Sequence, residues 1–166
     1  MSVFLQTLHT MQQDPRVQLM RQFRHHYFTN TYEHCCHVAI YSYLLARRFH
    51  LKIDEEALVR GALLHDYYLY DTRTMPISNF RHVISHAEAA ALNAAADFDL
   101  TEREKQIIRS HMWPLNLTKL PRSKEALLVC IADKCCARRE LTRWKRHAAS
   151  RRLQFAPKPA PTALSA

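Results

Sequence analysis

The feature that most constrains this sequence is its single glycine, Gly61, among 166 residues. Sandwiches, barrels, Rossmann folds and P-loops use several glycines, because their turns and phosphate cradles need backbone with positive φ. Helices need few glycines, and an apolar fraction of 48% is enough to build a core. We therefore expect an all-α fold, and the length is that of one domain.

Helix start signals stand at five places in the chain. Polar N-cap candidates precede apolar stretches, and three of them have a glutamate three residues on, as in a capping box. These candidates are Asn30, Asp54, Ser85, Thr101 and Ser123. The predicted helices cover 3–13, 15–26, 30–49, 55–65, 85–96, 101–113 and 123–144. The sequence thus predicts a bundle of about six or seven helices, with no strand-like alternation to compete.

The two ends of the chain differ in composition. Residues 1–150 are predicted to form one helical domain, whereas residues 151–166 are rich in proline and alanine and are expected to be a disordered tail. No run of about 18 apolar residues is present for a bilayer span. The N-terminus also lacks the basic start and apolar stretch of a signal peptide. These features predict a cytoplasmic protein with no membrane partner, and its five cysteines are expected to be reduced.

The positive charge is concentrated near the C-terminus. The chain carries a net charge of +9, and residues 134–152 hold eight basic residues against one acidic residue, Glu140. Such a segment is commonly a solvated helix face that runs into a tail, but it can also steer an anionic substrate. Its charge also allows nucleic acid as a partner, although nothing else in the sequence favours this.

Four of the predicted helices each place a histidine or an aspartate on an apolar face. His34, for example, shares its face with Val38, Tyr41 and Leu45 at helical spacing. The other three are His65, His111 and Asp133. A lone histidine on such a face is commonly an ordinary core residue, but a buried carboxylate needs a cation or several donors. Histidines and carboxylates that converge inside a helical bundle are typical of a metal site.

The order of these residues resembles the HD-domain superfamily of metal-dependent phosphohydrolases. Members have a histidine early in one helix, a His-Asp doublet ending another, and an aspartate within a later helix. Here these positions are His34, His65-Asp66 and Asp133, and the resemblance spans about residues 26–140. The chain is similar to small bacterial HD proteins with a His-Met-Trp-Pro stretch and an Asp-Lys pair. The Gly-Tyr-Pro signature of the branch that cleaves cyclic dinucleotides is absent.

The resemblance implies a set of metal ligands. One divalent ion would be held by His34, His65, Asp66 and Asp133. In two-metal members two further histidines hold a second ion, here His86 and His111, with Asp66 as the bridge. Mixed nitrogen and oxygen ligands suit iron, manganese, cobalt, nickel or zinc, in one or two ions, without choosing among them.

Residues beside the implied ligands are expected to act on the substrate. Asp66 and Lys134 are the expected catalytic residues, with Lys134 beside the ligand Asp133 to neutralise charge on phosphate. His26, Arg81 and His82 are the expected substrate-binding residues.

The expected function is that of a metal-dependent phosphohydrolase. It would act on a nucleotide or another small phosphate ester through a metal-activated water. One alternative keeps the metals and changes the chemistry, because a minority of the superfamily are di-iron oxygenases with the same ligand order. Another alternative is a non-enzymatic, metal-stabilised helical domain whose basic segment binds nucleic acid or an acidic protein. The substrate and the oligomeric state remain open.

Overall fold

The computed structural model describes residues 2–25, 29–70 and 79–154, without the side chains of residues 79–84 and 147–154. These ranges contain seven α-helices and no strand, which confirms the all-α prediction. The helices are α1 (Val3–Gln13), α2 (Pro15–Leu19), α3 (Thr31–Arg48), α4 (Glu55–Leu64), α5 (Asn79–Asp97), α6 (Glu102–Ser110) and α7 (Lys124–Gln154), with a 3₁₀ helix, η1 (Met20–Gln22), after α2.

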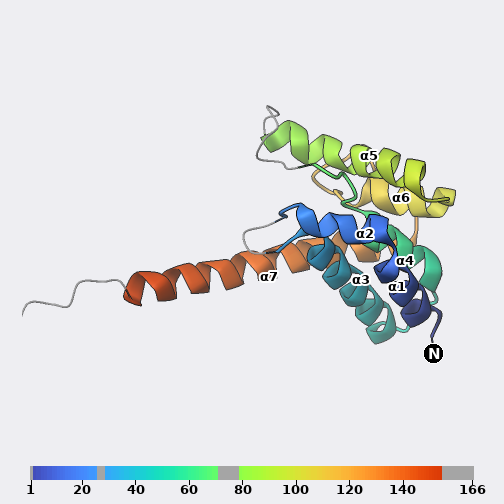
Figure 1. The fold of residues 1–166 in the computed structure, drawn as a ribbon. Helices are drawn as coiled ribbons and strands as arrows, with labels where there is room; N and C mark the ends of the chain where they lie inside the picture. The colour runs from blue at the N-terminus through green and yellow to red at the C-terminus, as the bar shows by residue number, and fades with distance from the viewer. Residues whose placement is uncertain (1, 26–28, 71–78, 155–166) are drawn as a thin grey trace, which may run out of the picture.

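Helix α4 is the centre of the bundle. It contacts α1, α3, α5, α6 and α7, and seven of its ten residues are buried. Figure 1 shows α5 and α6 paired on one side of α4, with α1 and α3 on the other. Because α4 is surrounded, the residues that follow its last turn begin in the interior of the protein.

The predicted N-caps at Asn30, Asp54 and Thr101 are confirmed by their hydrogen bonds. Asn30 Oδ1 accepts from the backbone N–H of Glu33 at 2.9 Å, and Asp54 Oδ1 accepts from that of Ala57 at 3.0 Å. Thr101 forms a complete capping box, since each residue of the pair with Glu104 accepts from the backbone N–H of the other. These side chains satisfy donors that a helix start leaves unpaired.

The only glycine of the chain serves a close helix contact. Gly61 lies within α4 and does not have a positive φ. A Cβ atom at this position would lie 2.7 Å from Cγ2 of Ile107 on α6, closer than carbon atoms pack. Glycine is therefore needed here for the approach of two helices rather than for a turn. Positive φ values fall instead on His50 and Leu69, at 51° and 53°.

Several predicted helix boundaries are wrong, including the end of the helix expected over 101–113, which lies at Ser110. The helix expected over 15–26 ends early, because the chain turns back through hydrogen bonds from His25 N–H to Thr29 O and from Thr31 N–H to Phe23 O. Helix α5 begins at Asn79 rather than at Ser85. Residues 79–84 contain no proline or glycine, so nothing in them interrupts the helix.

The predicted apolar face of α3 is correct only in part. His34 and Val38 are fully buried, but Tyr41 is 37% exposed, because the buried face turns instead through Ser42 and Ala46. Each step of four residues rotates about 40° beyond a full turn, so this buried stripe winds around the helix.

Helix α7 is longer than expected. It runs ten residues beyond Trp144, to Gln154, and Figure 1 shows it extending past the other helices. Residues 155–166 lie outside the described residues, so the division into a domain over 1–150 and a tail over 151–166 stays a prediction. Within the described ranges, no helix combines the length and the apolar character that a membrane span needs.

Candidate metal centre

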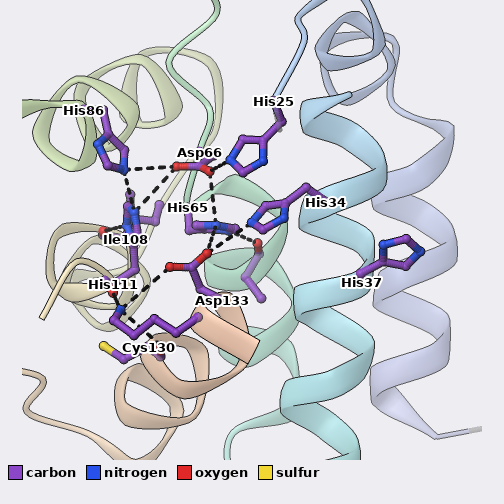
Figure 2. A network of polar contacts seen from close by, with 12 residues as sticks. His25, His34, His37, His65, Asp66, His86, Ile108, His111, Cys130 and Asp133 are labelled. Carbon is purple, nitrogen blue, oxygen red and sulfur yellow. Dashed lines mark hydrogen bonds and ion pairs between the residues drawn. The ribbon is translucent and has the colours of Figure 1, made fainter. Parts of the chain in front are cut away.

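The structure brings all six predicted metal ligands together in the interior. His34 comes from α3, His65 and Asp66 follow the last turn of α4, and all three are buried. The other three, also buried, are His86 on α5, His111 after α6 and Asp133 on α7. Figure 2 shows their side chains pointing toward one another. Five elements of the bundle therefore meet at one cluster.

The first group of ligands lies between α3, α4 and α7. His34 Nε2 is 3.2 Å from Asp133 Oδ1. His65 Nε2 lies 3.4 Å from Asp66 Oδ2 and 3.9 Å from Asp133 Oδ1. Asp133 Oδ1 thus lies within 4 Å of both imidazoles, and His65 also lies beside Asp66, so the four residues that the resemblance implies are neighbours.

The second group of ligands lies between α4, α5 and α6. The Nε2 atoms of His86 and His111 are 2.9 Å apart. Asp66 Oδ1 lies 3.4 Å from His86 Nε2 and 3.5 Å from His111 Nε2. Since Asp66 Oδ2 faces the first group, its two oxygens face different groups. This is the position that the predicted bridging carboxylate requires.

Two of the histidines are oriented by the ends of their own helices. His65 Nδ1 lies 2.7 Å from the carbonyl oxygen of Ala62, and His111 Nδ1 lies 2.8 Å from that of Ile108. Carbonyls in the last turn of a helix have no partner further along it, so they can accept from a ring N–H. A hydrogen on Nδ1 leaves the Nε2 lone pair of a neutral ring free to bind a metal.

Two buried atoms at the centre are unsatisfied. Among the described residues, His65 Nε2 and Asp66 Oδ1 make no hydrogen bond. Leaving such groups buried costs about 1–3 kcal/mol each, and more for a charged group. Neighbouring ligand atoms on one ion, with bonds of about 2.1 Å, lie about 3 Å apart. The spacings in the two groups run from 2.9 to 3.9 Å, so small side-chain shifts would let the residues present hold a divalent metal.

The charges of the cluster are strongly coupled. Burial opposes ionisation of Asp66, but His65 and His25 outweigh it and hold the pKa of Asp66 well below its usual range. Burial also opposes protonation of His65, yet Asp66 raises the pKa of His65 well above 6.5. Burial, together with the charge of His65, lowers the pKa of His111 to about 3. The His111 ring therefore stays neutral, which is the state that binds a metal.

Two residues of the cluster were not predicted from the sequence. His25 Nε2 bonds Asp66 Oδ2 at 2.8 Å, and the His25 ring stacks on the ring of His34 at a centroid distance of 3.9 Å. Burial opposes protonation of His25, but the hydrogen bonds to Asp66 and Glu140 raise the pKa of His25 to about 9. Glu140 on α7 lies 3.1 Å from His34 Nδ1. The available signal for Glu140 was its position two helical turns after Asp133, as the only acid in a basic segment.

The predicted substrate residues are placed less completely. His26 lies outside the described residues, and its neighbour His25 is the histidine seen at the cluster. Arg81 and His82 lie on the first turns of α5, with side chains outside the described part. Lys134 Nζ donates to the carbonyl oxygens of His111 and Cys130, at 2.8 and 3.2 Å, and lies 3.8 Å from Asp133 Oδ2.

Comparison with known proteins gives one family. The family model described as HD domain matches residues 31–138, which include His34, the His65-Asp66 doublet and Asp133. Searches of curated proteins and of solved structures find no significant match. HD domains bind divalent metals and are typical of metal-dependent phosphohydrolases. Because the family model covers more than half of the chain, the protein belongs to the HD domain family.

Proposed function

We propose that this protein is a metal-dependent phosphohydrolase acting on a nucleotide or another small phosphate ester. The observation that carries the proposal is the pair of unsatisfied buried atoms, His65 Nε2 and Asp66 Oδ1, within a cluster of histidines and carboxylates. A divalent cation between these two groups and their neighbours would give both atoms a partner in the interior. The family match is consistent with the same chemistry.

The ligand atoms define what each residue would hold. His34, His65, Asp66 and Asp133 would hold one ion, and His86 and His111 a second one that shares Asp66. Divalent ions at such a site supply Lewis-acid charge and lower the pKa of a bound water. Asp66 is the residue on which both groups depend, because its two oxygens face them separately.

Two cationic side chains assist from the edge of the cluster. The His25 ring, held by Asp66, is positioned to place positive charge near a phosphate oxygen. Lys134 fixes the carbonyl of His111 and adds a positive charge beside Asp133. In the proposal Lys134 thus supports the reaction by holding His111, and its charge also offsets that of the substrate.

We propose that three further basic residues bind the substrate. Arg81 and His82 lie on the same helix as the ligand His86, within two turns of it. His26 is next to His25 in the chain. Their basic side chains suit a phosphate group, which is the chemistry that the proposal assigns to them.

The test is phosphate release by the manganese-loaded protein. The wild type should cleave a generic phosphodiester or release phosphate from nucleotides, and Asp66→Asn and His65→Ala should abolish this activity. Asp99→Asn and His9→Ala are matched controls at exposed positions and should retain it. A wild type that binds manganese but cleaves no member of a broad phosphate-ester panel would contradict the proposal.

A further inference from the structure

The histidine ligands are oriented in two different ways. His65 and His111 stand just after the last turns of α4 and α6, where a carbonyl three residues back accepts from Nδ1. His34 stands inside α3, which continues to Arg48, so the carbonyls around it are used by the helix itself. The Nδ1 atom of His34 therefore needs an acceptor from another element.

The acceptor is Glu140 on α7. Glu140 Oε1 lies 3.1 Å from His34 Nδ1, and His34 Nε2 faces Asp133 Oδ1 at 3.2 Å. We propose that Glu140 is a positioning residue that keeps the hydrogen of His34 on Nδ1, so that Nε2 is free to bind an ion. This inference rests on the proposed function, because it takes Nε2 of His34 as a ligand atom.

The position of the Glu140 carboxylate is itself fixed. Its Oε2 atom accepts from the hydroxyl of Thr29 at 3.1 Å, just before α3. His25 Nδ1 lies 3.9 Å from Oε2, and His37 Nδ1 lies 3.9 Å from Oε1. The side chain of Glu140 is 9% exposed, so water competes little for its oxygens. A buried acceptor held from both sides orients a ring better than a mobile one.

The placement of Glu140 separates this contact from the motif of the family. The family match ends at residue 138, two residues before Glu140. Asp133 and Glu140 are seven residues apart on α7, so both face α3 and bind opposite nitrogens of one ring. One helix thus provides both a proposed ligand and the residue that orients another.

Metal affinity tests the inference without any enzyme assay. Zn²⁺ is titrated calorimetrically into the metal-free full-length protein, its Glu140→Ala and Glu140→Gln variants, and Glu102→Gln as a control at a side chain that is 85% exposed. We expect Zn²⁺ affinity to fall about 10- to 100-fold in Glu140→Ala. The Zn²⁺ affinity of Glu140→Gln should lie between those of the wild type and Glu140→Ala, because an amide oxygen still accepts from Nδ1 but lacks the charge. The control should match the wild type.

Proton NMR of the Zn²⁺-saturated proteins gives a second measurement. The Nδ1–H of His34 should exchange slowly with water in the wild type and rapidly in Glu140→Ala. If Glu140→Ala does not fold, Glu140→Gln carries both measurements. Equal Zn²⁺ affinity of the wild type and a folded Glu140 variant, with unchanged exchange of this proton, overturns the inference and leaves the proposed function standing. Absence of Zn²⁺ binding by the wild type contradicts the proposed function, and the inference fails with it.

Discussion

The Nε2 atoms of His86 and His111 lie 2.9 Å apart, although His86 lies on α5 and His111 follows the end of α6. Two neutral imidazoles at this distance share one hydrogen, or they direct two lone pairs at one ion. The His111 Nδ1 atom faces the carbonyl oxygen of Ile108, so the ring hydrogen is on Nδ1 and the free lone pair of His111 is on Nε2. The second group of ligands thus depends on the packing of α5 on α6, whereas the first depends on α3 and α7.

Loss of Asp133 should therefore affect metal binding differently from loss of His86. We expect Asp133→Ala to retain less metal than His86→Ala, because it removes a negative charge that compensates the ion, whereas His86→Ala removes a neutral ligand. Elemental analysis of both variants after dialysis measures the difference. Equal or greater loss in His86→Ala would show that the two groups are assigned in the wrong order.

Replacement of the only glycine should destabilise the fold. A Cβ atom at residue 61 would meet buried Ile107 at 2.7 Å, which is overpacking, although alanine has the better helix propensity. We expect Gly61→Ala to lower the free energy of unfolding by about 1–2 kcal/mol after both effects. Urea denaturation of the metal-free protein measures it. The Ile107→Ala variant lacks the nearest atom, so adding Gly61→Ala to it should lower the free energy of unfolding by less than in the wild type. An equal loss in the two proteins would refute the steric cause.

The sequence was sufficient for the all-α architecture, and its resemblance to a known family supplied the six proposed ligands. One glycine, N-caps at Asn30 and Thr101, and the spacing of the histidines predicted a helical bundle with a buried cluster, because helix periodicity and capping are local properties. The order of the ligands resembled a known family, and the match over residues 31–138 confirms that resemblance. Helix starts and helix faces do not depend on how distant segments pack.

The residues around the ligands could not be predicted in the same way. His25 reaches Asp66 only because the chain turns back between Phe23 and Thr31, through hydrogen bonds that no sequence period reveals. The resemblance indicated the neighbouring His26, which lies outside the described residues. Glu140 looked like one acid in a basic, solvated helix face, and only the packing of α7 on α3 directs it to His34.

The distal part of α7 should be dispensable for metal binding. Truncation after Trp144 keeps Asp133, Lys134 and Glu140, so we expect the shortened protein to bind the same amount of metal. It removes basic residues of segment 134–152, and affinity for highly charged substrates should weaken and lose part of its salt dependence. Calorimetric metal titration and Michaelis constants at two salt concentrations test both statements. A truncated protein that folds but binds no metal would show that the tail contributes to the site.

Metal exchange separates the two chemistries that the ligand set supports. Phosphate-ester hydrolysis needs Lewis-acid charge and an activated water, which a redox-silent ion can supply. Oxygen activation by a di-iron oxygenase requires iron that changes its valence. We therefore expect the protein loaded with manganese or zinc to remain active toward phosphate esters in the absence of dioxygen, and phosphate release under argon is the measurement.

The control for metal exchange is the same protein loaded with iron in air and under argon. A hydrolase should release phosphate at equal rates in both, since dioxygen is not a reactant. His65→Ala and Asp66→Asn should be inactive with every metal, because Asp66 faces both groups of ligands and His65 Nε2 is a proposed ligand that makes no hydrogen bond among the described residues. Turnover that appears only with iron and dioxygen, and that manganese silences, would replace the hydrolase proposal with the oxygenase.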